Sequence, residues 1–174
     1  MGAGTSNSPR TTACPCVRGA APAGRAPLCL ACGSTWRVAL IRQLYSDFAC
    51  EAVLEEPECA PEHQLLDQPK KVLTRYFDDR LASLLVADRE CEARTHGICN
   101  MDFSPVWDSQ DWSGTYVVIR AASDSNHVDA RLRLSRNTVR ALRYTLVRTP
   151  AGWRIHDIGA PKKWSLVKSL SGKP

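Results

Sequence analysis

Apolar residues recur with a helical period in two stretches of the first half of the chain. From Trp36 to about residue 54 they fall at i, i+3, i+7 and i+10, which is one face of a helix. A second stretch, from about residue 68 to 87, repeats the pattern, and Asp67 is predicted as its N-cap. The residues expected to be buried are Val38, Leu40, Ile41, Leu44, Tyr45 and Phe48 in the first helix, and Val72, Leu73, Tyr76, Phe77, Leu81, Leu84 and Leu85 in the second.

Alternating apolar and polar residues in the second half predict strands instead. The strands are expected at 116–121, 128–134, 141–148 and 153–158, with a turn at 149–152 and a short helix at 164–170. Helices followed by a meander of antiparallel strands form an α+β arrangement. We therefore predict two N-terminal helices packed on a curved antiparallel sheet of about four strands, followed by a short C-terminal helix.

Residues 1–35 are rich in Ala, Gly, Pro, Ser and Thr and show no period, so we predict a disordered or removable leader-like segment before a single α+β domain at 36–171. Within this segment, 28–34 resembles the end of a bacterial lipoprotein signal. Four cysteines at C-x-C and C-x-x-C spacing offer another hypothesis, a cytosolic zinc-binding protein. They are Cys14, Cys16, Cys29 and Cys32.

Charge is distributed in blocks along the chain. Residues 1–37 carry four arginines and no acid (+4), 38–111 carry seven bases and fifteen acids (−8), and 112–174 carry twelve bases and three acids (+9). Two interpretations follow: acidic helices pack beside a basic sheet and compensate its charge, or a basic sheet face binds an anionic partner. Nucleic acid is not expected, because its recognition uses exposed aromatic residues and those of the sheet are expected in the core. No apolar run is long enough for a transmembrane helix.

The four cysteines of the domain form two pairs that are close in sequence. Cys50 and Cys59 flank a proline-containing loop, and Cys91 and Cys99 flank Gly97. Two local disulfides are predicted, each worth about 2–3 kcal/mol, and they indicate an oxidising compartment, the periplasm or cell envelope. The alternatives are four reduced thiols in the cytosol, or a catalytic thiol, which no obvious base accompanies, since His96 is close to Cys91 and Cys99 only in sequence.

A cluster of polar residues in the long connection at 88–115 is the first candidate site. Its carboxylates, amide and indole suit a pocket for a ligand or partner, although capping of turns would use the same residue types. No calcium-loop motif is present, and no metal or cofactor is predicted. The cluster comprises Asp102, Trp107, Asp108, Gln110 and Asp111.

His156 and Asp157 lie on the last predicted strand. Strict alternation places them on opposite faces, with Asp157 beside Trp153 and Ile155 and with His156 beside Ile158. Asp157 is therefore a candidate for a structural ion pair or for the ligand site. No nucleophile, phosphate-loop or zinc-protease motif occurs. A small hydrolase or isomerase that uses Asp102, Asp111, His156 or Asp157 is the alternative function.

Five segments of the domain occur in a characteristic order: YFDDRLASLL (76–85), C-x7-C (91–99), NMDFSPVWDSQDWSG (100–114), GWRIHDI (152–158) and SLVKSL (165–170). Together they resemble a bacterial domain family of unknown function, made of small envelope or lipoprotein-type proteins. The resemblance implies a cone-shaped fold like that of nuclear transport factor two and the ketosteroid isomerases, and it implies no activity. We expect a non-enzymatic envelope protein that binds a small ligand or a protein partner, and a homodimer is compatible with this expectation.

Overall fold

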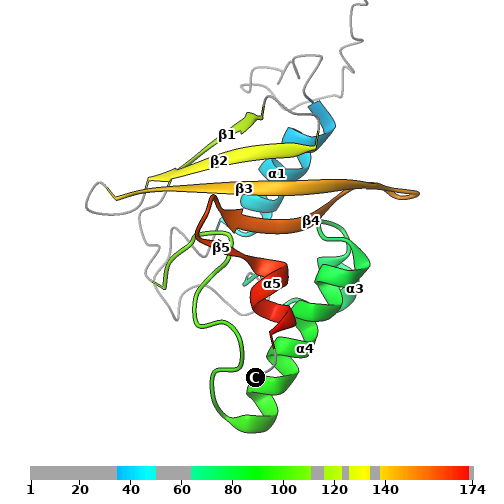
Figure 1. Cartoon of the computed structure of the whole chain (residues 1–174). Coiled ribbons are helices and arrows are strands. Elements are labelled where there is room, and N and C mark those ends of the chain that lie inside the picture. Colours follow the sequence, from blue (N-terminus) through cyan, green and yellow to red (C-terminus); the bar gives the residue numbers. More distant parts are fainter. Residues whose placement is uncertain (1–34, 50–63, 111–115, 123–125, 134–137, 173–174) are drawn as a thin grey trace, which may run out of the picture. The chain divides into compact units, whose positions relative to one another are not determined.

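Five antiparallel strands form one sheet in the order β1-β2-β3-β4-β5, which makes this an α+β fold (Figure 1). The computed structural model describes residues 35–49, 64–110, 116–122, 126–133 and 138–172. The sheet belongs to the second of two units, Met1–Thr35 and Trp36–Pro174. The helices are α1 (Thr35–Asp47), α3 (Lys70–Leu73), α4 (Asp79–Thr95) and α5 (Leu166–Ser171); the strands are β1 (Tyr116–Ala121), β2 (His127–Arg133), β3 (Val139–Thr149), β4 (Gly152–Ala160) and β5 (Trp164–Ser165).

The predicted apolar face of α1 is confirmed, because Val38, Ile41, Leu44 and Tyr45 are all buried. Its predicted end is wrong. The helix stops at Asp47, and the buried Phe48 follows in a turn. The part of the predicted helix beyond residue 49 lies outside the described residues. The period of apolar residues shows which side of a helix is buried but does not show where the helix ends, because an apolar residue in the turn after the helix can pack on the same side.

The second predicted helix is two helices, α3 and α4, separated by a segment that pairs with the sheet. Phe77 forms a parallel bridge with Ile155: the Ile155 N–H donates to the Tyr76 carbonyl (2.8 Å), and the Asp78 N–H donates to the Ile155 carbonyl (2.9 Å). These bonds take the backbone out of the helix. The Asp78 side chain then accepts from the Leu81 N–H (2.8 Å) and begins α4 as its N-cap.

Both outer ends of this helical region also differ from the prediction. The residue before α3 is Pro69, with no side-chain cap, so Asp67 does not cap the helix. Proline suits this position because its fixed φ matches the start of a helix and it has no N–H to satisfy. At the other end, α4 continues past the predicted end near residue 87 to Thr95, and His96 closes it in the left-handed region (φ 54°).

The sheet contains the four predicted strands and a fifth, β5, at its edge. Residues 164–165 were predicted to begin the final helix, but they pair with Gly159 and Ala160 of β4 before α5 starts. The approach is close: a Cβ on Gly159 would lie 2.5 Å from the Trp164 carbonyl oxygen, which is shorter than any van der Waals contact. A glycine at position 159 therefore allows β5 to pair with β4. The alternation of apolar and polar residues does not reveal a two-residue pairing of this kind.

A β-bulge in β4 changes which side chains face the core. The register between β3 and β4 shifts so that His156 is the extra residue between Ile155 and Asp157. Ile155 and Ile158 are consequently both fully buried, although strict alternation would place them on opposite faces. The predicted faces of β4 beyond Ile155 are therefore wrong, and Asp157 does not share the core face of Ile155.

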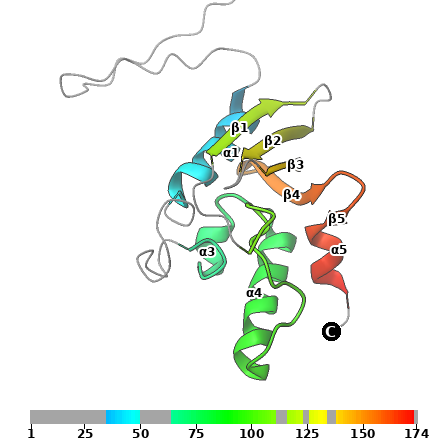
Figure 2. The ribbon, with the colours of Figure 1, turned by 90° about the vertical axis from the view of Figure 1, so that its left-hand side faces the viewer.

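The helix α1 lies against one face of β1–β3, and a buried tyrosine pair joins them (Figure 2). The Tyr45 hydroxyl donates to the Val106 carbonyl (2.8 Å), so its 2.7 Å contact with Tyr144 places the Tyr144 hydroxyl as donor to Tyr45. Burial raises the pKa of both tyrosines well above the usual value, so both hydroxyls remain protonated. The chain of two hydroxyls and one carbonyl satisfies polar atoms that burial would otherwise penalise.

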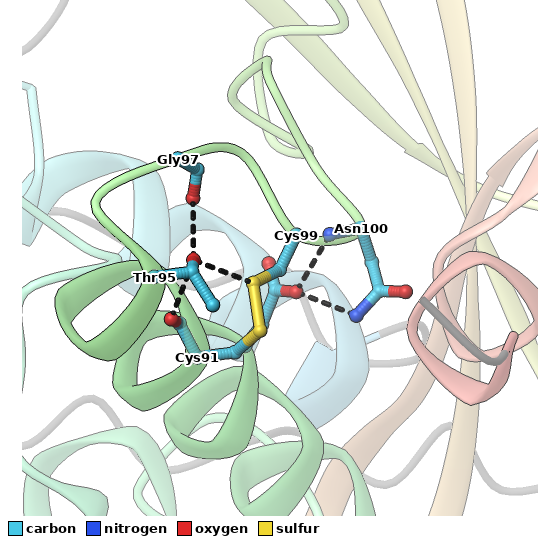
Figure 3. The surroundings of a disulfide bond; sticks show 6 residues. Cys91, Thr95, Gly97, Cys99 and Asn100 are labelled. Atoms are coloured by element: carbon cyan, nitrogen blue, oxygen red, sulfur yellow. Dashed lines mark hydrogen bonds between the residues drawn. A yellow bond between two sulfur atoms is a disulfide. The ribbon is translucent and has the colours of Figure 1, made fainter.

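A disulfide between Cys91 and Cys99 closes the loop after α4, as predicted (Figure 3). Their Cα atoms are 6.1 Å apart, within the usual range for a disulfide. The Thr95 hydroxyl lies 2.9 Å from the Cys91 carbonyl oxygen and 3.3 Å from that of Gly97, inside the closed loop. The other predicted disulfide, Cys50–Cys59, lies outside the described residues.

The residue after the disulfide is bonded to a buried carboxylate of α4. Asp88 is only 7% exposed, and its Oδ1 accepts from the Asn100 backbone N–H (3.0 Å) and side-chain amide (2.7 Å). Two donors compensate a buried carboxylate for lost water. The disulfide and these two bonds together hold the loop against the end of α4.

We expect Glu92→Gln to stabilise the protein at neutral pH by about 0.2–0.5 kcal/mol, the usual size of a like-charge i,i+4 repulsion on a helix. Burial, Asp88 and Asp67 raise the pKa of Glu92 above 4.5. Because the pKa of Glu92 is higher in the folded protein than in the unfolded chain, the protonated carboxyl favours folding and the ionised one opposes it. The stability that protonated Glu92 contributes is therefore lost as pH rises through its folded-state pKa. The gain from Gln should therefore disappear in acid below the unfolded-state pKa.

Urea denaturation of both proteins at neutral and acidic pH measures this difference. The matched control is Glu90→Gln, because Glu90 is exposed on the same helix and lies four residues before Arg94 rather than after an acid. Equal effects of the two substitutions at neutral pH would rule out a specific repulsion at Glu92.

Candidate functional site

The polar cluster predicted in the loop after α4 is held together by its own hydrogen bonds. The Gln110 side-chain amide donates to the Asp102 carbonyl (2.9 Å) and to its carboxylate (3.1 Å). An antiparallel bridge joins Ser104 and Ser109, in which the Ser104 N–H donates to the Ser109 carbonyl (3.1 Å). The structure thus brings Asp102 and Gln110 together as the closure of a turn. Asp111 lies outside the described residues.

Trp107 and Asp108, in the same turn, connect it to the rest of the protein. Trp107 is 2% exposed and packs edge-on against Tyr45, with ring centroids 5.1 Å apart. Asp108 has a positive φ (52°), which aspartate tolerates better than most residues, and its Oδ1 accepts from the Trp164 indole N–H (2.8 Å). Its other oxygen lies 3.7 Å from Arg140. Both residues join the turn to the core and sheet.

His156 pairs with the N-cap of α4. Its Nδ1 lies 2.5 Å from Asp78 Oδ2, while Asp78 Oδ1 accepts the Leu81 N–H. Asp78 was not predicted as a site residue. An aspartate directly before an amphipathic run is an N-cap signal, so this role could have been found in the sequence. The carboxylate holds the imidazole ring in one orientation, and the histidine side chain is 36% exposed.

Asp157 begins a different helix. Its carboxylate accepts from the Ser165 hydroxyl (2.7 Å) and from the Val167 N–H (3.0 Å), in the first turn of α5. Ser165 itself accepts from the Lys168 N–H as N-cap. Negative charge is favourable at a helix N-terminus, so Asp157 stabilises the junction of β5 and α5. The predicted ion pair of Asp157 is replaced by this capping arrangement.

These contacts do not assemble a catalytic group. Within the described part of the chain, no hydrogen bond joins two of the candidates Asp102, His156 and Asp157, which contact separate elements. The described residues also contain no group of three or more His, Cys, Asp or Glu side chains arranged to hold a metal ion. Of the helices that the structure describes, none is long and apolar enough to cross a membrane.

The side of β1–β3 opposite α1 is the strongest candidate surface. Side chains of three cross-strand rows share it, because they lie two residues apart on each strand. We call it the arginine face. The residues of these rows whose side chains the structure describes are Arg133 and Val139; Val118, Arg131 and Ala141; and Arg120, Asp129 and Arg143.

The arginine face is exposed and positively charged. Its four arginines are all exposed, and its single acid, Asp129, lies 2.8 Å from Arg143 Nε, which leaves a net charge of +3 from four arginines and one aspartate. The α1 helix lies on the other side of these strands, where Tyr144 meets Tyr45. Helix α1 therefore does not cover the arginine face.

Comparison with known proteins adds little to this picture. No protein-family model and no curated protein matches the chain. Among solved structures, a phospholipid-binding protein from Ralstonia solanacearum, in complex with a phospholipid, is similar at 16% identity and a TM-score of 0.42 over 77% of this chain and 82% of that one. A likeness at this level carries no argument about the function of this chain.

Proposed function

We propose that this chain is a non-enzymatic envelope protein that binds an anionic partner through the arginine face. The single observation that carries the proposal is the concentration of exposed arginines in three adjacent rows with one carboxylate. In the register Asp129 lies directly between Arg120 and Arg143, and none of the four arginines is directly opposite another. Arg131 is a diagonal neighbour of Arg120 and Arg143 and lies two residues from Arg133, so these like charges repel each other at a distance of about 6.5–8 Å. A partner that supplies negative charge removes this repulsion, so the surface has lower free energy when it is occupied.

The contacts of the predicted polar residues support binding over catalysis. Asp102 closes a turn, Asp157 caps α5, and His156 is bonded to the N-cap of α4. Catalysis requires such groups to converge on a common point, and each of these is committed to a different element. The described residues therefore offer no observation in favour of the alternative hydrolase or isomerase, whose fourth candidate, Asp111, lies outside them. The alternative zinc site at the N-terminal cysteines also lies outside the described residues.

The envelope location is part of the proposal and rests on chemistry. Disulfides such as Cys91–Cys99 persist in oxidising compartments and are rare in the cytosol. The resemblance to cone-shaped envelope proteins points in the same direction, and membership of that family, with a sheet curved into a cone, belongs to the proposal as well.

Chromatography on a heparin resin tests whether the arginine face binds anions. The test protein is Arg120→Gln/Arg131→Gln, since both residues are exposed on adjacent strands of the face. The matched control is Arg80→Gln/Arg94→Gln, which removes the same charge from exposed positions on α4. We expect the face variant to elute at clearly lower salt, because fewer counterions are released on binding. Equal elution of the two variants would contradict the proposal.

A further inference from the structure

The cations of the arginine face are spread over an area and do not converge on one point. Residues of one face repeat about every 6.6–6.8 Å along a strand, and neighbouring strands lie about 4.8 Å apart. Arg120 lies on β1, Arg131 and Arg133 on β2, and Arg143 on β3. A single small anion would contact only part of this array. A planar surface with many anionic groups could contact all of it.

The cations of the face suit an anionic group that accepts paired hydrogen bonds. All of them are arginines, although the described chain also carries exposed lysines, such as Lys162 and Lys163 after β4. The planar guanidinium donates two parallel hydrogen bonds to a phosphate or a carboxylate, and a lysine ammonium acts only as a point charge.

Exposed aliphatic residues lie among these arginines. Val118 is 38% exposed and lies opposite Arg131 on the neighbouring strand, and Val139 is 57% exposed opposite Arg133. Aliphatic groups beside cations suit the boundary between headgroups and acyl chains of a bilayer. Single-stranded nucleic acid is recognised by aromatic side chains on which its bases stack. The described uncharged neighbours of these arginines are aliphatic instead: Val118, Val139 and Ala141.

We infer that the partner of the arginine face is a membrane surface that contains anionic phospholipids. This inference rests on the proposed function and names the partner class. The protein lies on the bilayer through β1–β3, its arginines contact lipid phosphates, and Val118 and Val139 meet the apolar boundary. Each arginine near an anionic leaflet contributes on the order of a tenfold or smaller gain in partitioning, so a face with a net charge of +3 gives reversible and salt-sensitive attachment.

Sedimentation with vesicles tests the inference on the full chain. The probes are vesicles of phosphatidylcholine with phosphatidylglycerol, and vesicles of phosphatidylcholine alone. We expect binding to the first and not to the second. Loss of two arginines in Arg120→Gln/Arg131→Gln should weaken partitioning by roughly 30-fold, while Arg80→Gln/Arg94→Gln should bind almost as the parent does. Urea denaturation confirms that both variants are folded.

Two other outcomes separate failure of this inference from failure of the proposed function. If vesicles are not bound but the face variant still elutes earlier from heparin, or loses binding to polyglutamate, the partner is a soluble polyanion or an acidic protein, and the lipid inference is overturned. If both variants behave alike on vesicles and on heparin, the arginine face is not a binding surface and both proposals fall.

Discussion

Trp107→Ala is expected to lower the free energy of unfolding by about 3–5 kcal/mol, the usual range when a large buried side chain is truncated. The sequence alone also allowed Trp107 to line a ligand pocket. In the structure it is 2% exposed and packs on Tyr45, whose hydroxyl bonds to the carbonyl of the preceding Val106. Loss of the indole leaves a cavity between α1 and the loop and loosens this hydrogen-bonded contact.

Urea denaturation followed by circular dichroism measures the effect. Trp36→Ala is the matched control, because Trp36 is 80% exposed and its truncation should change stability by no more than about 0.5 kcal/mol. Trp107→Phe keeps an aromatic ring and should lose less than Trp107→Ala, which preserves the test if the alanine variant does not fold. A Trp107→Ala protein as stable as the parent would return Trp107 to the ligand-site hypothesis.

Removal of the disulfide by Cys91→Ser/Cys99→Ser should cost about 2–3 kcal/mol, the chain-entropy value for a loop this short. The two cysteines are eight residues apart, and the bond restricts the unfolded chain more than it adds contacts to the folded one. The hydrogen bonds of Asp88 with Asn100 remain in the variant, so the loop should stay folded.

The parent and the double-serine variant should differ in denaturation midpoint only under oxidising conditions. In excess dithiothreitol the parent's disulfide opens, and the difference between the two proteins should vanish, because both then lack the cross-link. A difference that persists under reduction would show that the serine side chains themselves disturb the loop. No difference in either condition would show that the disulfide adds no stability.

The buried faces of α1 and β2 were predictable from the sequence, but the bulge that changes the faces of β4 and the places where elements break were not. Val38, Ile41 and Leu44 are buried on α1 as their spacing indicates, and Arg131 and Arg133 are exposed on β2 as alternation indicates. The spacing of residues that share one face depends only on the backbone geometry within a single helix or strand, so it can be read from the sequence. The break after α3, by contrast, exists because Phe77 pairs with Ile155, far away in the chain.

The candidate site follows the same division. The sequence singled out the polar residues of the loop as a candidate ligand site, with capping of turns as the alternative, and gave Asp157 as part of an ion pair or of that site. Their partners were not predictable, because Asp157 reaches Val167 and His156 reaches Asp78 only after a bulge resets β4. A bulge inserts one residue into a strand, so every side chain after it points to the opposite face from the one that strict alternation predicts. No local sequence pattern marks the position of a bulge.

By itself, the sequence determined the α+β class, the succession of helices followed by antiparallel strands, the buried faces of α1 and β2 and the Cys91–Cys99 pair, because each depends on residues close together in the chain. Only the tertiary structure decided that arginines from three strands form one surface. Strand register, set by hydrogen bonds between distant residues, aligns Arg120, Asp129 and Arg143 in one row. Only the packing of α1 against the opposite face leaves that row exposed.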